Sequence, residues 1–197
     1  RSAGLARELG RPLVVLEALR AGYPYASDRL HAFVLAGMAE NARRLAGRAL
    51  HHAYVEPAAG EGRGLLEALA ARACAVVTDD YPTFFLPRML AAAAPRLDVR
   101  LEAVDGSCLV PFRLAGRDFP TAHGYRRHLQ QVLPAWLDRL PSPDPLSRAR
   151  LPRLEALLIA RGRNADVRNR GVAGETTVDG LARIDSVIAQ GGNAMLI

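Results

Sequence analysis

The sequence predicts an α/β fold: a Rossmann-like open parallel sheet with helices on both faces. Two observations lead to this prediction. Short apolar runs of strand length alternate along the chain with longer segments whose apolar residues recur at helical spacing. Polar residues directly follow the apolar runs, as they do where parallel strands end at the ligand-binding edge of such a sheet. With 50% of its 197 residues hydrophobic, the chain can bury one sizeable core.

The chain begins with a helix end, a strand and a long helix. Residues 1–9 are typical of the last turns of a helix closed by a cap at Gly10, so we expect the sequence to start inside an element. The continuous apolar run from Pro12 to Leu16 predicts a strand covered on both faces. Ser27 is a suitable N-cap for an amphipathic helix over 28–47. Its inner stripe is expected to comprise Leu30, Phe33, Val34, Met38 and Leu45.

The same alternation continues to residue 140. Further strands are expected over 50–55, 74–78 and 99–104, and the last has the partial alternation of an edge strand. Further helices are expected over 65–72, 84–94 and 121–140, with an interruption near Pro134. Gly60, Gly62 and Gly64 predict a flexible loop before the first of these helices. Phe85 and Met89, four residues apart, are expected to pack on the sheet.

A cluster of prolines at 141–145 marks a domain boundary. We therefore expect an α/β domain over 1–140 and a linker with a poorly packed tail over 141–197. Within the tail, the sequence predicts short helices near 148–158 and 178–189 and a loop over 161–177. Because apolar residues are sparse there, residues 146–197 are expected to add few contacts to the core.

The positive charge of the chain comes entirely from arginine, and its two cysteines do not predict a disulfide framework. The net charge is +6 and the chain contains no lysine. These arginines either attract phosphate or are spread over solvated helix faces. Cys74 and Cys108 lie in or beside apolar segments, where free cysteines behave as small hydrophobes, and a cytoplasmic location fits this pattern. No apolar run approaches the roughly 18 residues that a membrane span requires.

Polar side chains follow the third and fourth predicted strands. Asp79 and Asp80 come directly after one strand, and Asp105 and Ser107 close the next. Since the carboxyl ends of parallel strands meet at one edge of a sheet, these residues are expected to surround a shared concavity. The alternative is that the carboxylates cap helices or satisfy loop amides.

Aromatic and basic residues flank the two aspartates. Tyr81 and Phe84 are candidates to stack on a planar ligand, while Arg88 either pairs with Asp80, reaches a phosphate or is solvated. The sequence lacks a Gly-x-Ser-x-Gly elbow, a Gly-Lys-Ser phosphate loop and a dinucleotide glycine fingerprint. Two adjacent histidines on a strand, His51 and His52, point to opposite faces, so we expect no metal site.

Three segments resemble a known family. Val76 to Met89, together with Ala26–Leu35 and Val104–Pro111, resembles the N-terminal α/β (antenna) domain of the DNA photolyase/cryptochrome family. The nearest members are of class II and the bacterial photolyase-like type. The resemblance covers about residues 1 to 145, so it concerns one domain of a longer flavoprotein, and the chain looks like a fragment.

The resemblance implies a fold and a function. The fold is a five-stranded sheet in the order 3-2-1-4-5, from which this chain would lack the first, central strand. The implied function is to hold a light-harvesting pigment, a deazaflavin or a folate, for light-dependent DNA repair. In the family, FAD and DNA bind a helical C-terminal domain. The parent resembles deoxyribodipyrimidine photo-lyase, and whether this chain belongs to an enzyme stays open because none of that domain's motifs is found here.

The predicted strands are also expected to form specific pairs. Residues 12–17 should pair in parallel with 50–55, and 74–78 with 99–104. Without a central strand, 12–17 and 74–78 should pair directly or leave a gap. The alternative functions are a small nucleotide-binding domain of the universal-stress or adenine-nucleotide type, and a structural fragment that binds nothing.

Overall fold

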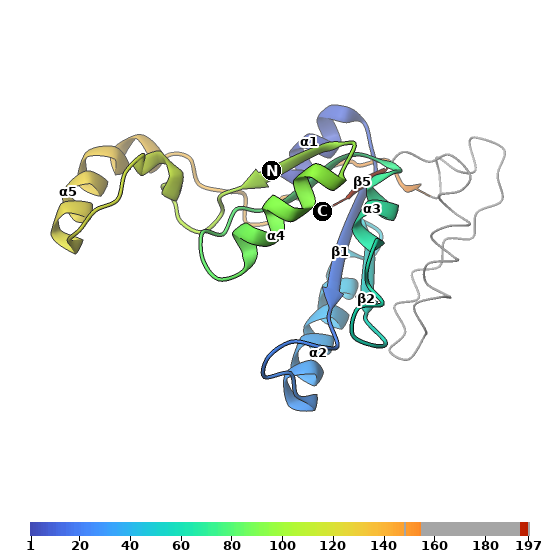
Figure 1. Cartoon of the computed structure of the whole chain (residues 1–197). Coiled ribbons are helices and arrows are strands. Elements are labelled where there is room, and N and C mark those ends of the chain that lie inside the picture. Colours follow the sequence, from blue (N-terminus) through green and yellow to red (C-terminus); the bar gives the residue numbers. More distant parts are fainter. Residues whose placement is uncertain (148, 155–193, 197) are drawn as a thin grey trace.

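The computed structural model describes residues 1–147, 149–154 and 194–196, the last three by their backbone alone. They form a five-stranded parallel sheet in the order β2-β1-β5-β3-β4, with helices packed against it (Figure 1). The strands are β1 (Leu13–Leu19), β2 (Leu50–Val55), β3 (Ala73–Asp79), β4 (Arg100–Val104) and β5 (Ala194–Leu196). The predicted α/β class is confirmed, as are the parallel pairs β1–β2 and β3–β4.

The helices lie close to their predicted positions. They are α1 (Ser2–Leu9), α2 (Asp28–Leu45), α3 (Leu65–Ala70), α4 (Leu86–Ala93) and α5 (Ala122–Val132). The described residues also form short 3-10 helices at η1 (Ala94–Arg96), η2 (Phe112–Ala115) and η3 (Leu133–Trp136). Gly10 ends α1 in the left-handed conformation with φ 60°, and the Ser27 side chain accepts a hydrogen bond from the Leu30 N–H at the start of α2. The predicted interruption near Pro134 is the change from α5 to η3.

The centre of the sheet differs from the prediction. Strands β1 and β3 neither pair directly nor leave a simple gap, because β5 lies between them. Leu196 of β5 is paired with Val14 of β1 on one side and with Val76 of β3 on the other. A parallel strand inside a sheet needs backbone partners on both edges, and β5 supplies them to both half-sheets.

The tail also contributes more to the core than predicted. Besides β5, Leu146 and Leu151 pack against the core, and Leu154 is buried. The expectation of few contacts is therefore wrong for these residues. The described part of the predicted helix at 148–158 has no helical residue over 149–153. The predicted loop at 161–177 and the helix at 178–189 lie outside the described residues.

Apolar side chains fill both faces of the sheet. On one face three residues of α3 pack on one residue from each of β1, β2 and β3. This cluster comprises Leu65, Leu69, Ala70, Val14, Tyr54 and Val76. On the other face Leu5 and Ala6 of α1 pack with Leu13 of β1 and with Ala75 and Val77 of β3. Each cluster contains residues of both β1 and β3, so the core is continuous across the central strand.

Two predictions about buried residues are wrong. Phe85 is 62% exposed and Met89 is also exposed, because no residue of α4 is buried against the sheet. Along α2 only Met38 is buried, whereas Phe33 is 78% exposed. Met38 and Asn41, which donates a hydrogen bond to Glu17 of β1 at 2.6 Å, both lie in the second half of α2, so the contact with the sheet that these residues show is made by that half.

Leu196 allows the role of β5 to be tested through the backbone alone. Proline at this position removes an N–H from a central strand, so Leu196→Pro should lower the free energy of unfolding by about 1–3 kcal/mol. Leu196→Val keeps the N–H and should cost less. Urea denaturation followed by circular dichroism measures both variants. Equal stability of the proline and valine variants would contradict a paired central strand.

His52 gives the fold a predicted sensitivity to acid. Burial lowers the pKa of His52 from 6.5 to about 4, and the neighbouring His51 acts in the same direction. Between these pH values the unfolded chain binds a proton that the folded chain excludes. The free energy of unfolding should therefore fall as the pH decreases, by up to about 3 kcal/mol in total. His52→Leu should lack this part of the pH dependence, and parallel pH profiles for the two proteins would refute the assignment.

Candidate functional site

The candidate site is the carboxyl edge of the sheet near β3 and β4. The connection from β1 to β2 leads toward one edge of the sheet and that from β3 to β4 toward the other, so the strand order reverses between β1 and β3, where β5 lies. In open α/β sheets ligands bind outside the carboxyl ends of the strands at such a switch point. Asp79 is paired with Val104, and the Asp80 N–H donates to the Val104 carbonyl at 2.8 Å. The structure therefore brings the segments after β3 and β4 together at one edge.

Asp80 is engaged by an arginine that the sequence did not suggest. Its carboxylate accepts hydrogen bonds from Nε and Nη2 of Arg113, which lies on η2, with 2.8 Å between Nη2 and Oδ1. This side-chain hydrogen bonding holds the pKa of Asp80 below its ordinary value. The ion-pair partner of Asp80 is therefore Arg113 and not Arg88, which the sequence had offered as one possibility. Arg88 lies exposed on α4.

Asp105, directly after β4, holds the loop that leads from β4 to η2. Its carboxylate accepts hydrogen bonds from the backbone N–H groups of Phe112, at 2.6 Å, and Ser107, at 3.3 Å. Together with the pair between Asp80 and Arg113, these contacts tie η2 to the ends of β3 and β4. Two of the predicted ligand-binding carboxylates therefore organise the loop, which is the structural alternative left open by the sequence. The predicted concavity around them stays a prediction.

The other candidates are exposed beside this loop. Asp79 and Ser107 are exposed, Tyr81 is 41% exposed and Phe84 is 81% exposed. Phe84 has φ 60°, in the left-handed region that is costly for an aromatic residue. The turn therefore holds its ring away from the core at the start of α4. Asp79, Tyr81, Phe84 and Ser107 are therefore accessible to a ligand at this edge.

A buried carboxylate on the neighbouring part of the edge was missed from the sequence. Glu56, 5% exposed and directly after β2, accepts N–H hydrogen bonds from Ala21 and Gly60, each at 2.9 Å, and from Gly62 at 3.3 Å. These backbone donors, Ala21 first, hold the pKa of Glu56 below its ordinary value. Two N–H groups of the glycine-rich loop are thus directed at a carboxylate of the chain itself and not at an external phosphate.

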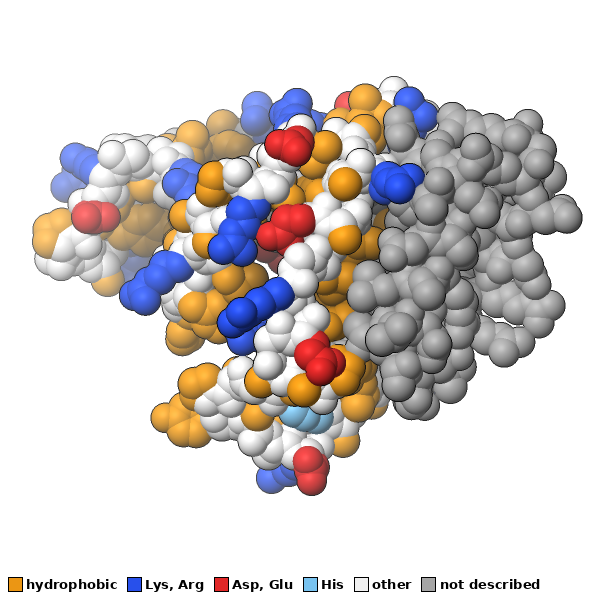
Figure 2. All heavy atoms as spheres, turned by 45° about the vertical axis from the view of Figure 1, so that its right-hand side comes forward, with side chains coloured by type: hydrophobic (Ala, Val, Ile, Leu, Met, Phe, Trp, Pro, Cys, Tyr) orange, Lys and Arg blue, Asp and Glu red, His pale blue; other side chains and the backbone are white. Residues whose placement is uncertain are grey.

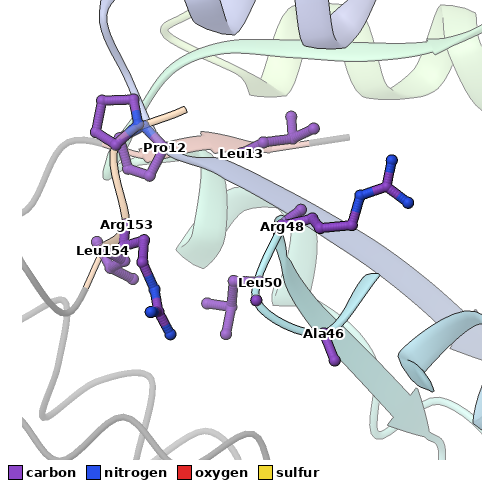
Figure 3. Close-up of a pocket in the computed structure, with 10 residues that line it drawn as sticks. Pro12, Leu13, Ala46, Arg48, Leu50, Arg153 and Leu154 are labelled. Atoms are coloured by element: carbon purple, nitrogen blue, oxygen red, sulfur yellow. The ribbon is translucent and has the colours of Figure 1, made fainter. Parts of the chain in front are cut away.

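A small cavity lies at the opposite end of the sheet. Figure 3 shows it at the amino ends of β1 and β2, lined by residues that include Pro12, Leu13, Arg48, Arg153 and Leu154. Its volume is about 150 Å³. Arg48 is ion-paired with Asp144, so the positive charge that its guanidinium brings to the cavity wall is partly neutralised. None of the predicted site residues lines it.

Charged side chains are mixed over the visible surface. Figure 2 shows arginines and acidic side chains interspersed with apolar ones on this face, without a continuous basic patch. In the described part of the chain, no group of three or more His, Cys, Asp or Glu residues could hold a metal ion. No helix there has the length and apolar character to cross a membrane.

Fold and edge together define a Rossmann-like α/β domain with preformed loops at the carboxyl ends of its strands. No family model matches the sequence, and no curated protein does so either.

Glu56 provides a test of how these loops are held. Glu56→Ala removes the acceptor shared by three N–H groups and should lower the midpoint of thermal unfolding by several degrees, while Glu56→Gln keeps one acceptor oxygen and should lower it less. Because the pKa of Glu56 is lowered on folding, its contribution should be present above pH 4.5 and disappear as the pH falls below that value. The exposed Glu61→Ala is the control, and equal midpoints for the Glu56 and Glu61 variants would contradict this role.

Proposed function

We propose that the chain is an antenna-type α/β domain of a photolyase-like flavoprotein, which holds a deazaflavin or folate pigment. The strand order is the observation that carries this proposal. The sheet order β2-β1-β5-β3-β4 corresponds to the order 3-2-1-4-5 that the sequence resemblance implies, with β5 in the position of the first strand. The segments that carry much of the resemblance, Val76–Met89 and Val104–Pro111, contain the ends of β3 and β4 and the loops of the candidate site.

The exposed side chains at this edge suit a planar, hydrogen-bonding pigment. Phe84 and Tyr81 offer aromatic faces for stacking, and Asp79 offers a carboxylate to a ring N–H or a ribityl-type hydroxyl. Arg88, one turn further along on α4, is available to an acidic group of the pigment. Asp80 and Asp105 act indirectly, since they fix the loop that borders the pigment.

This domain performs no bond-breaking step in the proposal. It orients a pigment so that absorbed energy passes to FAD in a separate helical domain, which would also bind the DNA. The segment around α5 is the proposed contact for that partner, because α5 projects from the sheet (Figure 1) and buries none of its residues. Exposed Leu137 and Leu140 follow it. The unpaired Cys74 and Cys108 fit a reducing, cytoplasmic location.

Pigment titration tests the proposal. Adding a deazaflavin or methenyl-folate to the purified chain should shift the pigment's absorbance or quench its fluorescence with a saturable dependence on protein concentration. Phe84→Ala should weaken binding by about threefold to tenfold, the range expected for one aromatic contact. Phe33→Ala removes an equally exposed phenylalanine from α2 and is the matched control. No spectral change with either pigment, or equal affinities for the two variants, would contradict the proposed site.

A further inference from the structure

The loops after β1 and β2 direct backbone N–H groups at one buried side chain. Ala21 donates from the first loop to one carboxylate oxygen of Glu56, and Gly60 and Gly62 donate from the second loop to the other. Converging backbone N–H groups of this kind form binding sites for phosphate and other anions. We call these three N–H groups the anion nest. Its occupant in this structure is a carboxylate of the chain itself.

The anion nest is held in shape by close contact between the two loops. A Cβ on Gly22 would lie 2.9 Å from the Cβ of Ala59, a separation at which side chains clash, so the loops touch at this point. A Cβ on Gly62 would lie 3.3 Å from the hydroxyl of the buried Tyr54 and 3.4 Å from Oε1 of Glu56. The donors are therefore positioned by the packing of the two loops as well as by the carboxylate that they bind.

Arginines add positive charge beside the anion nest. Nε of Arg63 lies 3.8 Å from the position that a Cβ on Gly60 would take. The N–H of Ala21 lowers the pKa of Glu56 most, and the positive charge of Arg20 acts in the same direction. One carboxylate thus balances the positive ends of three N–H dipoles and the charges of two nearby guanidinium groups. Without this carboxylate, the surroundings would favour another anion in its place.

We propose that Glu56 closes the anion nest to phosphate groups and thereby determines which ligands the carboxyl ends of β1 and β2 accept. A carboxylate tethered to the nest competes with dissolved phosphate at a high effective concentration, and its negative charge repels a second anion. The phosphates of a nucleotide are therefore excluded from the glycine-rich loop, whereas neutral and cationic groups are not. The inference does not depend on the proposed pigment, because only the contacts of Glu56 carry it.

Emptying the anion nest tests the proposal on the full chain. Glu56→Ala leaves the three N–H donors without their acceptor, and inorganic phosphate is then titrated at neutral pH and constant ionic strength. Phosphate should raise the thermal unfolding midpoint of this variant by several degrees and to a plateau, because a ligand that binds only the folded state stabilises it. The midpoint of the parent chain should change only through the general effect of phosphate on protein stability.

Two further variants separate the anion nest from a change in overall charge. Glu61→Ala removes one negative charge from an exposed position of the same loop and should respond to phosphate as the parent does. Glu56→Gln keeps a neutral side chain in the nest, so its response to phosphate should be smaller than that of Glu56→Ala. If Glu56→Ala does not fold in chloride buffer, it should recover the folded state on dilution into phosphate of equal ionic strength.

Three results would overturn the proposal. Phosphate that stabilises the parent chain as much as Glu56→Ala would show that Glu56 does not exclude it. Equal responses of Glu56→Ala and Glu61→Ala would show that the effect is one of net charge. Failure of phosphate to restore a Glu56→Ala chain that is unfolded in chloride would show that the three N–H groups do not form an anion site. None of these results bears on the pigment titration, which concerns the loops after β3 and β4.

Discussion

The hydrogen bonding of β5 to both β1 and β3 is the constraint on which the rest of this fold depends. Among the described residues, β5 is the strand that joins the half-sheet β2-β1 to the half-sheet β3-β4. Both core clusters extend across it, since Val14 and Val76 share one and Leu13 and Ala75 share the other. Parallel strands buried on both faces depend on such pairing, because their backbone groups have no water as an alternative partner. The relative placement of the strand ends, and so of the candidate site, follows from this short segment.

Carboxylates hold the loops at the carboxyl edge. Glu56 gathers N–H groups from the segments after β1 and β2, Asp105 fixes the start of η2, and Asp80 binds Arg113 on the same 3-10 helix. Hydrogen bonds to charged groups are stronger than neutral ones, so these contacts order loops that bury little apolar surface. The result is an edge whose loops are fixed before any ligand arrives and which leaves Tyr81 and Phe84 exposed.

The sequence predicted the features that depend on local pattern. Continuous apolar runs located β1 and β3, and Ser27 and Gly10 marked helix ends that the structure confirms. It could not predict β5, because three residues at 194–196 carry little strand signal and their partners lie more than a hundred residues away. The exposure of Phe85 was missed since helical spacing shows that a face is apolar without showing what covers it. The roles of Glu56 and Arg113 depend on donors and acceptors brought together from separate loops, a feature that no local motif encodes.

Amide hydrogen exchange of the folded chain tests the central claim most directly. If β5 is the central strand, the amides of Met195 and Leu196 that pair with its neighbours should exchange as slowly as those of Val14 and Val76, with which Leu196 is paired. Protection should be lost from all of these residues in a single cooperative transition as urea is added. Exchange of Met195 and Leu196 at the rate of an unstructured peptide, while Val14 and Val76 stay protected, would contradict the account.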